Sequence, residues 1–112
     1  MKGMCSLVLV LLAMSAMATA AADCSTWACR DVKIKASYGT SDGDTCVEAH
    51  GNMALLGCTL ASNTYITLRR SSLNYEEMYA ILLARQMSDR TVGIRIIDQS
   101  VGCNVSCIYA PS

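Results

Sequence analysis

The stretch "TCVEAHGNMALLGCTL", residues 45–60, carries two cysteines on either side of a His-Gly-Asn turn signal. Two strands meeting at a turn centred near Asn52 would place Cys46 directly across from Cys58, which favours a cross-strand disulfide. A metal site would need four ligands, and His50 is the only histidine in the chain. A redox pair would need Cys-x-x-Cys spacing, which does not occur. We therefore predict a disulfide-bonded hairpin with His50 at its exposed tip.

The N-terminus, residues 1–22, has the form of a secretory signal peptide. Lys2 precedes a short apolar run, and the small residues after it provide an A-x-A cleavage site. Removal of this segment leaves residues 23–112 as a single domain. The apolar run is too short for a strong membrane anchor, and Asp23 before Cys24 argues against lipidation. We expect a secreted protein, exported through the periplasm if bacterial, without insertion into a membrane.

The cysteines beyond the signal peptide fall into three close pairs. Besides the pair in residues 45–60, "CSTWAC" holds Cys24 and Cys29, and "CNVSC" holds Cys103 and Cys107. An even number of cysteines in a small exported chain indicates a disulfide framework, although six cysteines allow about fifteen connectivities. Spacing favours the bonds 24–29, 46–58 and 103–107. Trp27, inside the first loop, is expected to pack on its own disulfide rather than to point outward.

The charged residues and the single histidine exclude several classes of function. Nine basic residues balance nine acidic ones, which argues against nucleic-acid binding because that function needs a clustered basic face. A nucleophile paired with a histidine would depend entirely on His50. Asp42 and Asp44 resemble part of a calcium loop, but the required downstream glutamate is missing. We therefore expect no catalytic activity, no cofactor and no metal.

Most of the remaining sequence has the alternation typical of half-buried strands. The expected strands are "DVKIKASY" (31–38), "TYITLRR" (64–70), "TVGIRIID" (91–98) and a strand or hairpin in "VGCNVSCIYA" (101–110). In the second of these, Tyr65, Thr67 and Arg69 share one face. Strands, then one helix, then strands, joined by short connections, predict a mainly β fold. We expect an all-antiparallel, disulfide-bonded small barrel with one α-helix across it.

The single predicted helix lies in "SSLNYEEMYAILLARQMSDR", residues 71–90. Asn74 and Glu77 have the spacing of a reciprocal cap at its start. Its apolar residues cover more than one face, so the helix either makes a broad core contact or also packs against other subunits. The second hypothesis assigns an interface role to Tyr75, Met78, Tyr79, Ile81 and Leu83.

The loop in "SYGTSDGD", residues 37–44, is the candidate ligand-binding segment. It combines an aromatic ring, hydroxyls and carboxylates, which are the groups that hold sugars, although an ordinary polar loop has a similar composition. The candidate ligand-binding residues are Tyr38, Thr40, Ser41, Asp42 and Asp44.

Three segments, "CVEAHGNMALLGC", "YAILLARQMSDRTVGIRI" and "GCNVSC", give the chain a family likeness. Over residues 29–109 it resembles the B subunits of bacterial A-B toxins of the subtilase-cytotoxin and typhoid-toxin type. The resemblance implies an OB-fold barrel, five copies in a ring with helices lining the centre, host-glycan recognition and a docked catalytic A subunit. It also makes Ser41 the nearest match to the family's sialoglycan-binding serine. The acidic loop leaves a neutral glycan, or no glycan, open.

We therefore expect a secreted toxin binding subunit, a virulence factor without enzymatic activity. It would form a homopentamer, recognise host cell-surface glycans and carry a catalytic A subunit. The alternative is a monomeric, disulfide-rich secreted effector or inhibitor that binds a host protein.

Overall fold

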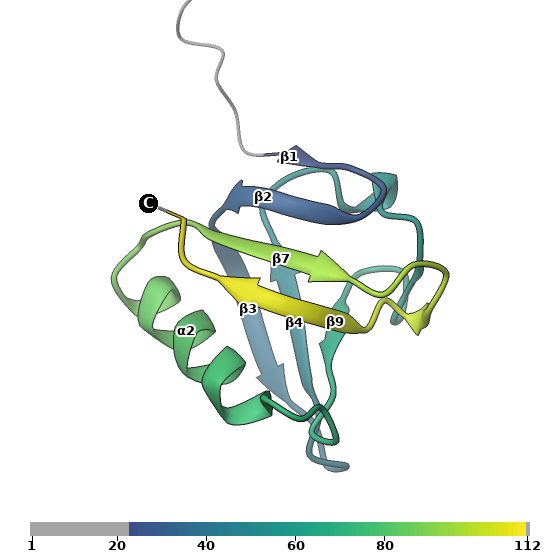
Figure 1. The fold of residues 1–112 in the computed structure, drawn as a ribbon. Coiled ribbons are helices and arrows are strands. Elements are labelled where there is room, and N and C mark those ends of the chain that lie inside the picture. The colour runs from purple at the N-terminus through teal and green to yellow at the C-terminus, as the bar shows by residue number, and fades with distance from the viewer. Residues whose placement is uncertain (1–22, 112) are drawn as a thin grey trace, which may run out of the picture.

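The computed structural model describes residues 23–111, so the predicted signal peptide lies outside the described residues. The described chain is mainly β with one α-helix, as predicted (Figure 1). Its elements are β1 (Asp23–Cys24), β2 (Ala28–Val32), β3 (Ile34–Gly39), β4 (Thr45–Ala49), the 3-10 helix η2 (Met53–Leu55), β5 (Thr59–Leu60), β6 (Ile66–Leu68), α2 (Tyr75–Met87), β7 (Val92–Ile96), β8 (Val101–Gly102) and β9 (Val105–Tyr109).

Two sheets share one bent stretch of chain. One sheet has the order β1-β2-β7-β9 and the other β3-β4-β6, and only Lys33 separates β2 from β3. A register shift between Cys29 and Val32, with Asp31 at φ 56°, marks a bulge where the chain turns from one sheet to the other. Val32 and Ile34 are both buried, so the predicted alternation keeps its apolar side inward through the bend.

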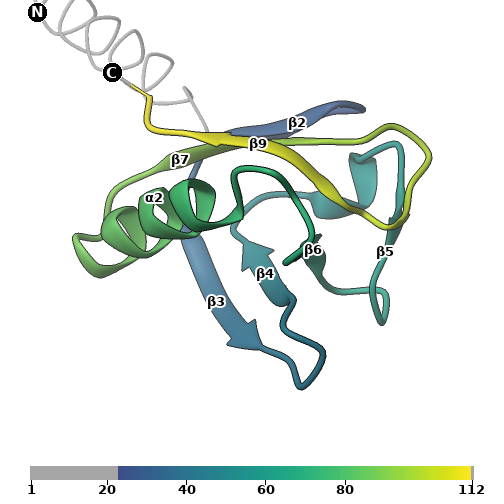
Figure 2. The same ribbon diagram turned by 60° about the horizontal axis from the view of Figure 1, so that its bottom comes forward.

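The two sheets meet again at β6 and β9. An isolated parallel bridge joins Thr67 to Asn104, and the Thr67 amide donates to the Cys103 carbonyl at 3.0 Å. The helix α2 packs against β9 and β3 on the remaining side (Figure 2), where the Ser37 hydroxyl donates to the Gln86 side chain at 2.8 Å. The strands and the helix therefore enclose one core.

The prediction of an all-antiparallel topology is wrong at β5 and β8. These strands run parallel, with Thr59 opposite Val101 and Leu60 opposite Gly102. The long connection between them contains α2, so the second strand can enter in the same direction as the first.

The core consists of the inward faces predicted from alternation. Ile66 and Leu68 of β6 are fully buried, and so are Val92 and Ile94 of β7. From α2, Leu82 is fully buried among them. Burial of a branched side chain of this size stabilises the fold by about 1.5–3 kcal/mol.

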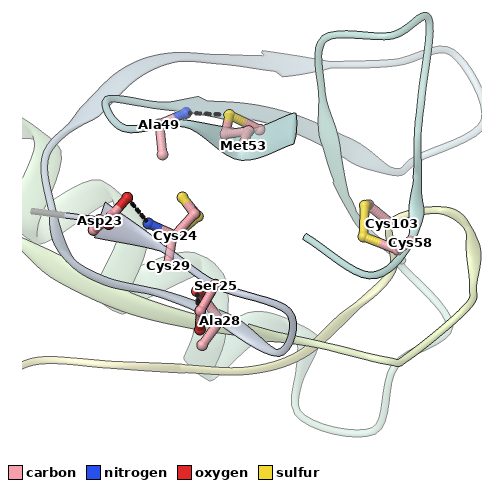
Figure 3. The surroundings of a disulfide bond; sticks show 9 residues. All are labelled: Asp23, Cys24, Ser25, Ala28, Cys29, Ala49, Met53, Cys58 and Cys103. Atoms are coloured by element: carbon pink, nitrogen blue, oxygen red, sulfur yellow. Dashed lines mark hydrogen bonds between the residues drawn. A yellow bond between two sulfur atoms is a disulfide. The ribbon is translucent and has the colours of Figure 1, made fainter. Parts of the chain in front are cut away.

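The predicted hairpin across residues 45–60 does not form. β4 pairs with β3 and β6, and the chain after it turns into η2. Met53 and Leu56, three residues apart, are both buried, which is the spacing of a helical turn rather than of a strand. The Ala49 amide also donates to the Met53 sulfur at 3.3 Å (Figure 3). His50 is exposed after β4, as expected, but it is not at the tip of a hairpin.

One of the three predicted disulfides is confirmed. Cys24 and Cys29 lie opposite each other on β1 and β2 and are bonded (Figure 3). The second bond joins Cys58 to Cys103, so the predicted pairs 46–58 and 103–107 are wrong. Within residues 23–111, Cys46 and Cys107 are free thiols.

The register explains why these predicted pairs fail. Thr45 and Val47 point into the core, so Cys46 between them points to the outer face of β4. Cys58 follows η2 and lies just before β5, whose partner β8 ends next to Cys103. The parallel pairing of β5 and β8 therefore brings together two cysteines that are far apart in the sequence.

Two predictions for the helix need correction. Asn74 is the N-cap residue of α2, but its side chain makes no capping hydrogen bond. Met78, expected at a subunit interface, is buried in the subunit's own core. Tyr75 packs against that core, and its hydroxyl lies 2.8 Å from the Thr45 hydroxyl. Because α2 turns these side chains toward the sheets, only the other side of the helix is available for contact.

Candidate ligand-binding site

The outer face of the β3-β4-β6 sheet carries a row of three side chains. The register places Tyr38 opposite Cys46, and Cys46 opposite Thr67. Residues opposite one another in adjacent strands share a face of the sheet. Arg69, two residues after Thr67, lies on this same side, as the alternation in residues 64–70 predicted.

The predicted binding loop closes one end of this row. The Thr40 amide donates to the Asp44 carbonyl at 2.9 Å, and the Gly43 amide donates to the Thr40 carbonyl at 3.1 Å. Gly43 has φ 94°, a left-handed conformation that glycine adopts without strain. These bonds make the loop a tight turn with defined side-chain positions.

Asp42 is the exposed acceptor of this turn. The Thr40 hydroxyl donates to its carboxylate, and the Asp44 amide donates to the same oxygen at 3.3 Å. The Thr40 hydrogen bond, followed by the Asp44 amide and the charge of Arg69, lowers the pKa of Asp42 below its usual 3.8. Asp42 is therefore a carboxylate at neutral pH and can accept further hydrogen bonds from a ligand.

Asp44 anchors the loop to the neighbouring strands. Its carboxylate accepts from the Arg70 amide at 2.8 Å and lies 3.3 Å from Nη1 of Arg69. The Nε group of Arg69 donates to the Asn104 side chain at 2.9 Å. Only 14% of the Asp44 side chain is exposed, and both of its oxygens have partners. It therefore positions the loop and Arg69 rather than offering a free acceptor.

The loop and the strands together form an open hollow of about 400 Å³, which we call the loop hollow. Its lining residues are Thr40, Asp42, Asp44, Cys46, Leu60, Ala61, Ser62, Thr67, Arg69, Val101 and Gly102. Three of the five predicted ligand-binding residues line it. The other two, Tyr38 and Ser41, are exposed but do not line it.

Tyr38 instead packs with a second aromatic residue. The rings of Tyr38 and Tyr65 form an edge-to-face pair with centroids 5.5 Å apart. Desolvation, together with the nearby Tyr38, raises the pKa of the Tyr65 hydroxyl, so it remains neutral at ordinary pH. The pair lies on the same sheet face as the loop hollow and adds aromatic surface beside it.

The thiol in the loop hollow is suited to packing rather than to chemistry. Cys46 is half-buried, and desolvation, with the charges of Asp42 and Asp44, raises its pKa. A thiol that stays protonated is a weak nucleophile and a poor metal ligand. Within residues 23–111, no group of three or more His, Cys, Asp or Glu side chains is arranged to hold a metal ion. The described groups of the hollow can donate and accept hydrogen bonds.

A second hollow, of about 600 Å³, lies on the outer face of the other sheet; we call it the arginine hollow. Its lining residues are Ser25, Trp27, Ala28, Arg30, Arg95, Cys107 and Tyr109. The expectation that Trp27 packs on its own disulfide is wrong, because the residue is 57% exposed and lines this outer hollow. Cys24 and Cys29 direct their sulfurs into the core, and Trp27 lies at the turn between their strands. Sequence reasoning did not find this hollow, because its residues come from three strands that are distant in the chain.

The fold and the two hollows define a small, mainly β domain with two disulfides, which is consistent with an extracellular protein. Among the described residues, no helix has both the length and the apolar character needed to cross a membrane. Comparisons with protein-family models, curated proteins and solved structures found no match to this chain.

Proposed function

We propose that this protein is a secreted binding subunit of an A-B toxin that recognises host cell-surface glycans through the loop hollow. In this proposal five copies form a ring that carries a catalytic A subunit, and the chain itself performs no catalysis. The observation that carries glycan binding is Asp42, an exposed, ionised acceptor that lines the same hollow as Thr67 and Arg69.

The strand order supports an OB-fold-like barrel. The bent β2–β3 strand pairs with β4 and with β7, β4 pairs with β6, and β7 pairs with β9. The parallel bridge between Thr67 of β6 and Asn104, the residue before β9, closes the circuit, and α2 lies in the connection between β6 and β7. A five-stranded, partly open barrel of this kind is a common scaffold for binding oligosaccharides and oligonucleotides.

The groups in the loop hollow support a sugar ligand. The Asp42 carboxylate can accept from sugar hydroxyls, while Arg69 and Thr67 supply donors. Tyr38 lies on the same face, and its exposed ring can contact the apolar face of a sugar. The exposed negative charge of Asp42 favours a neutral glycan at this site over an acidic one.

The outer side of α2 supports an assembly. Tyr79 stacks on Tyr75 with ring centroids 5.8 Å apart, and Met87 and Leu73 are strongly exposed, Leu73 completely. Leu83 is half-exposed on the same helix. Several exposed apolar side chains close together on one helix favour contact with another subunit.

Glycan-array binding and native mass spectrometry test the two parts of the proposal. Asp42→Asn and Thr67→Val should reduce binding to a neutral glycan about tenfold, because the first replaces a charged acceptor by a weaker one and the second removes a hydrogen bond to the ligand. The matched control Asp98→Asn changes an exposed carboxylate outside the loop hollow and should bind as the unmodified chain does. Unchanged binding by both test variants would place the ligand elsewhere, and a stable monomer at micromolar concentration would refute the ring.

A monomeric effector or inhibitor that binds a host protein is the second candidate. Val101 at the rim of the loop hollow and Ile97 near it in sequence are exposed apolar side chains, as protein contacts require. In that case Val101→Asp would abolish binding to a protein partner and no sugar would compete. Competition by a free oligosaccharide would exclude this candidate.

A further inference from the structure

The arginine hollow is built on a regular arrangement across β2, β7 and β9. In one row, Ala28 lies opposite Arg95, and Arg95 lies opposite Cys107. Arg30 is two residues beyond Ala28, within the bulge of β2, and it is exposed and lines the same hollow as Arg95. The small side chains of Ala28 and Cys107 line the hollow together with the two arginines.

Among residues 23–111, both guanidinium groups are without a protein partner. Within residues 23–111, neither Arg30 nor Arg95 makes an ion pair or a side-chain hydrogen bond. Arg69, by contrast, is held by Asp44 and Asn104. No acidic side chain lines the described part of the hollow. Two unpaired arginines on one concave surface make a positive potential that attracts an anion.

Two acidic residues, Asp23 and Asp31, lie near Arg30, and within residues 23–111 neither makes an ion pair with it. Asp31, the next residue in the chain, accepts from the Thr91 hydroxyl at 2.7 Å. Asp23 lies opposite Arg30 in the register of β1 and β2. Its carboxylate accepts instead from the Cys24 amide at 2.7 Å (Figure 3), and it does not line the hollow.

Two aromatic rings flank the arginines, and each is held in place by a specific feature. Trp27 lies at the turn that the Cys24–Cys29 bond closes, and its carbonyl accepts from the Ile96 amide at 2.9 Å. Tyr109 lies over Gly93, where a β-carbon would come within 2.1 Å of its ring. Gly93 therefore lets this ring lie against the sheet at the edge of the hollow.

We infer that the arginine hollow is a second ligand site, which binds a sulfated saccharide. A sugar ring would stack on the exposed indole of Trp27, while its sulfate would bridge Arg30 and Arg95. A sulfate ester presents three oxygens, which suits donors from two separate arginines, whereas one arginine fork already satisfies both oxygens of a planar carboxylate. This site is separate from the loop hollow and does not depend on a ligand there.

Isothermal titration with a chondroitin sulfate oligosaccharide tests the inference, using the same oligosaccharide with its sulfates removed as the control. The unmodified protein should bind the sulfated form at least tenfold more tightly, and raising the salt from low to high should weaken that binding. Both forms keep their carboxylates, so equal binding of the two would overturn the assignment to sulfate. Absence of binding to the sulfated form would overturn the site.

Variants identify the residues responsible. Arg30→Gln and Arg95→Gln should each weaken binding of the sulfated form about tenfold, as expected for loss of a charge-assisted hydrogen bond, and Trp27→Ala should do the same through loss of stacking. Arg90→Gln is the matched control, because Arg90 is exposed and lies outside the hollow. An equal loss in the control would show non-specific attraction by total charge and overturn the inference.

Two further measurements distinguish this site from a subunit contact and from the loop hollow. Native mass spectrometry of the arginine variants should show an unchanged assembly, whereas a change in subunit number would mean that the arginine hollow is a subunit contact and would overturn the inference. Asp42→Asn should leave binding of the sulfated form unchanged. If the unmodified protein fails to bind a neutral glycan but prefers the sulfated form, only the loop hollow is refuted; if it binds the neutral glycan but shows no sulfate preference, only the arginine hollow is refuted.

Discussion

Loss of the Cys58–Cys103 disulfide should destabilise this domain much more than loss of Cys24–Cys29. The first bond spans 45 residues and the second spans 5. In the chain-entropy model these separations correspond to about 4 and about 2 kcal/mol of free energy of unfolding. A domain of this size has roughly 5–15 kcal/mol in total, so the double variant Cys58→Ala/Cys103→Ala should lose a large fraction of its stability.

The assay is urea unfolding followed by circular dichroism, with thermal melts of the same variants. For a domain of this length about 1 kcal/mol lowers Tm by roughly 4–8 °C, so the long-range variant should melt about 15–30 °C lower than the unmodified protein. Cys24→Ala/Cys29→Ala should melt about half as far below it. An equal or larger loss from the short-range variant would refute the reasoning.

A peptide map of the non-reduced protein checks the connectivity on which this prediction depends. Cys58 and Cys103 should appear in one linked peptide pair. Cys46 and Cys107 should be alkylated without prior reduction. A linked pair of Cys46 with Cys58 would refute the assignment and restore the hairpin expected from the sequence.

Three further predictions concern Gly93, Asp42 and Cys46. Gly93→Val should cost at least about 1–3 kcal/mol in urea unfolding because the new side chain meets the Tyr109 ring, whereas Gly39→Ala, where a β-carbon meets nothing within 4 Å, should be close to neutral. The folded-state pKa of Asp42 is depressed, so its contribution to stability is present above the unfolded value of 3.8 and is lost as the pH falls through the folded value. The difference in unfolding free energy between the unmodified chain and Asp42→Asn should therefore shrink below pH 3.8, and a difference independent of pH would contradict this. Cys46, with its raised pKa, should react with iodoacetamide at neutral pH more slowly than a free cysteine does, and its rate by mass spectrometry should rise steeply with pH.

The strands with strict alternation were predictable because their periodicity reflects burial on one side. Ile66 and Leu68 are buried and Arg69 is partly exposed, as their spacing indicates, although Thr67 between the first two is also buried. The bond between Cys24 and Cys29 was predictable because a short turn leaves those sulfurs few other partners. Local patterns of this kind do not depend on which strands become neighbours.

Contacts between distant segments were not predictable in the same way. Residues 53–56 look like a strand, but burial of Met53 and Leu56 makes this segment a helical turn, so β4 pairs with β6 instead. The same change moves Cys58 away from Cys46. Cys58 precedes β5 and Cys103 follows β8. The two cysteines meet because these strands, which are far apart in the sequence, pair in parallel.

The candidate binding residues show the same division. The composition of residues 37–44 marked Thr40 and Asp42, which do line the loop hollow. Composition could not show that Asp44 differs from Asp42 in being unavailable to a ligand. The Asp44 carboxylate accepts hydrogen bonds from Arg69 and from the Arg70 amide once β6 lies beside the loop.

By itself, the sequence determined the mainly β class, the position of α2, the inward faces of the strands and the Cys24–Cys29 bond. These depend on side-chain periodicity and short separations, which are local properties of the chain. Only the tertiary structure decided the Cys58–Cys103 bond, the outward position of Trp27 and its place beside Arg30 and Arg95. The physical reason is that strand pairing, set by burial of the whole core, chooses which distant side chains share a surface.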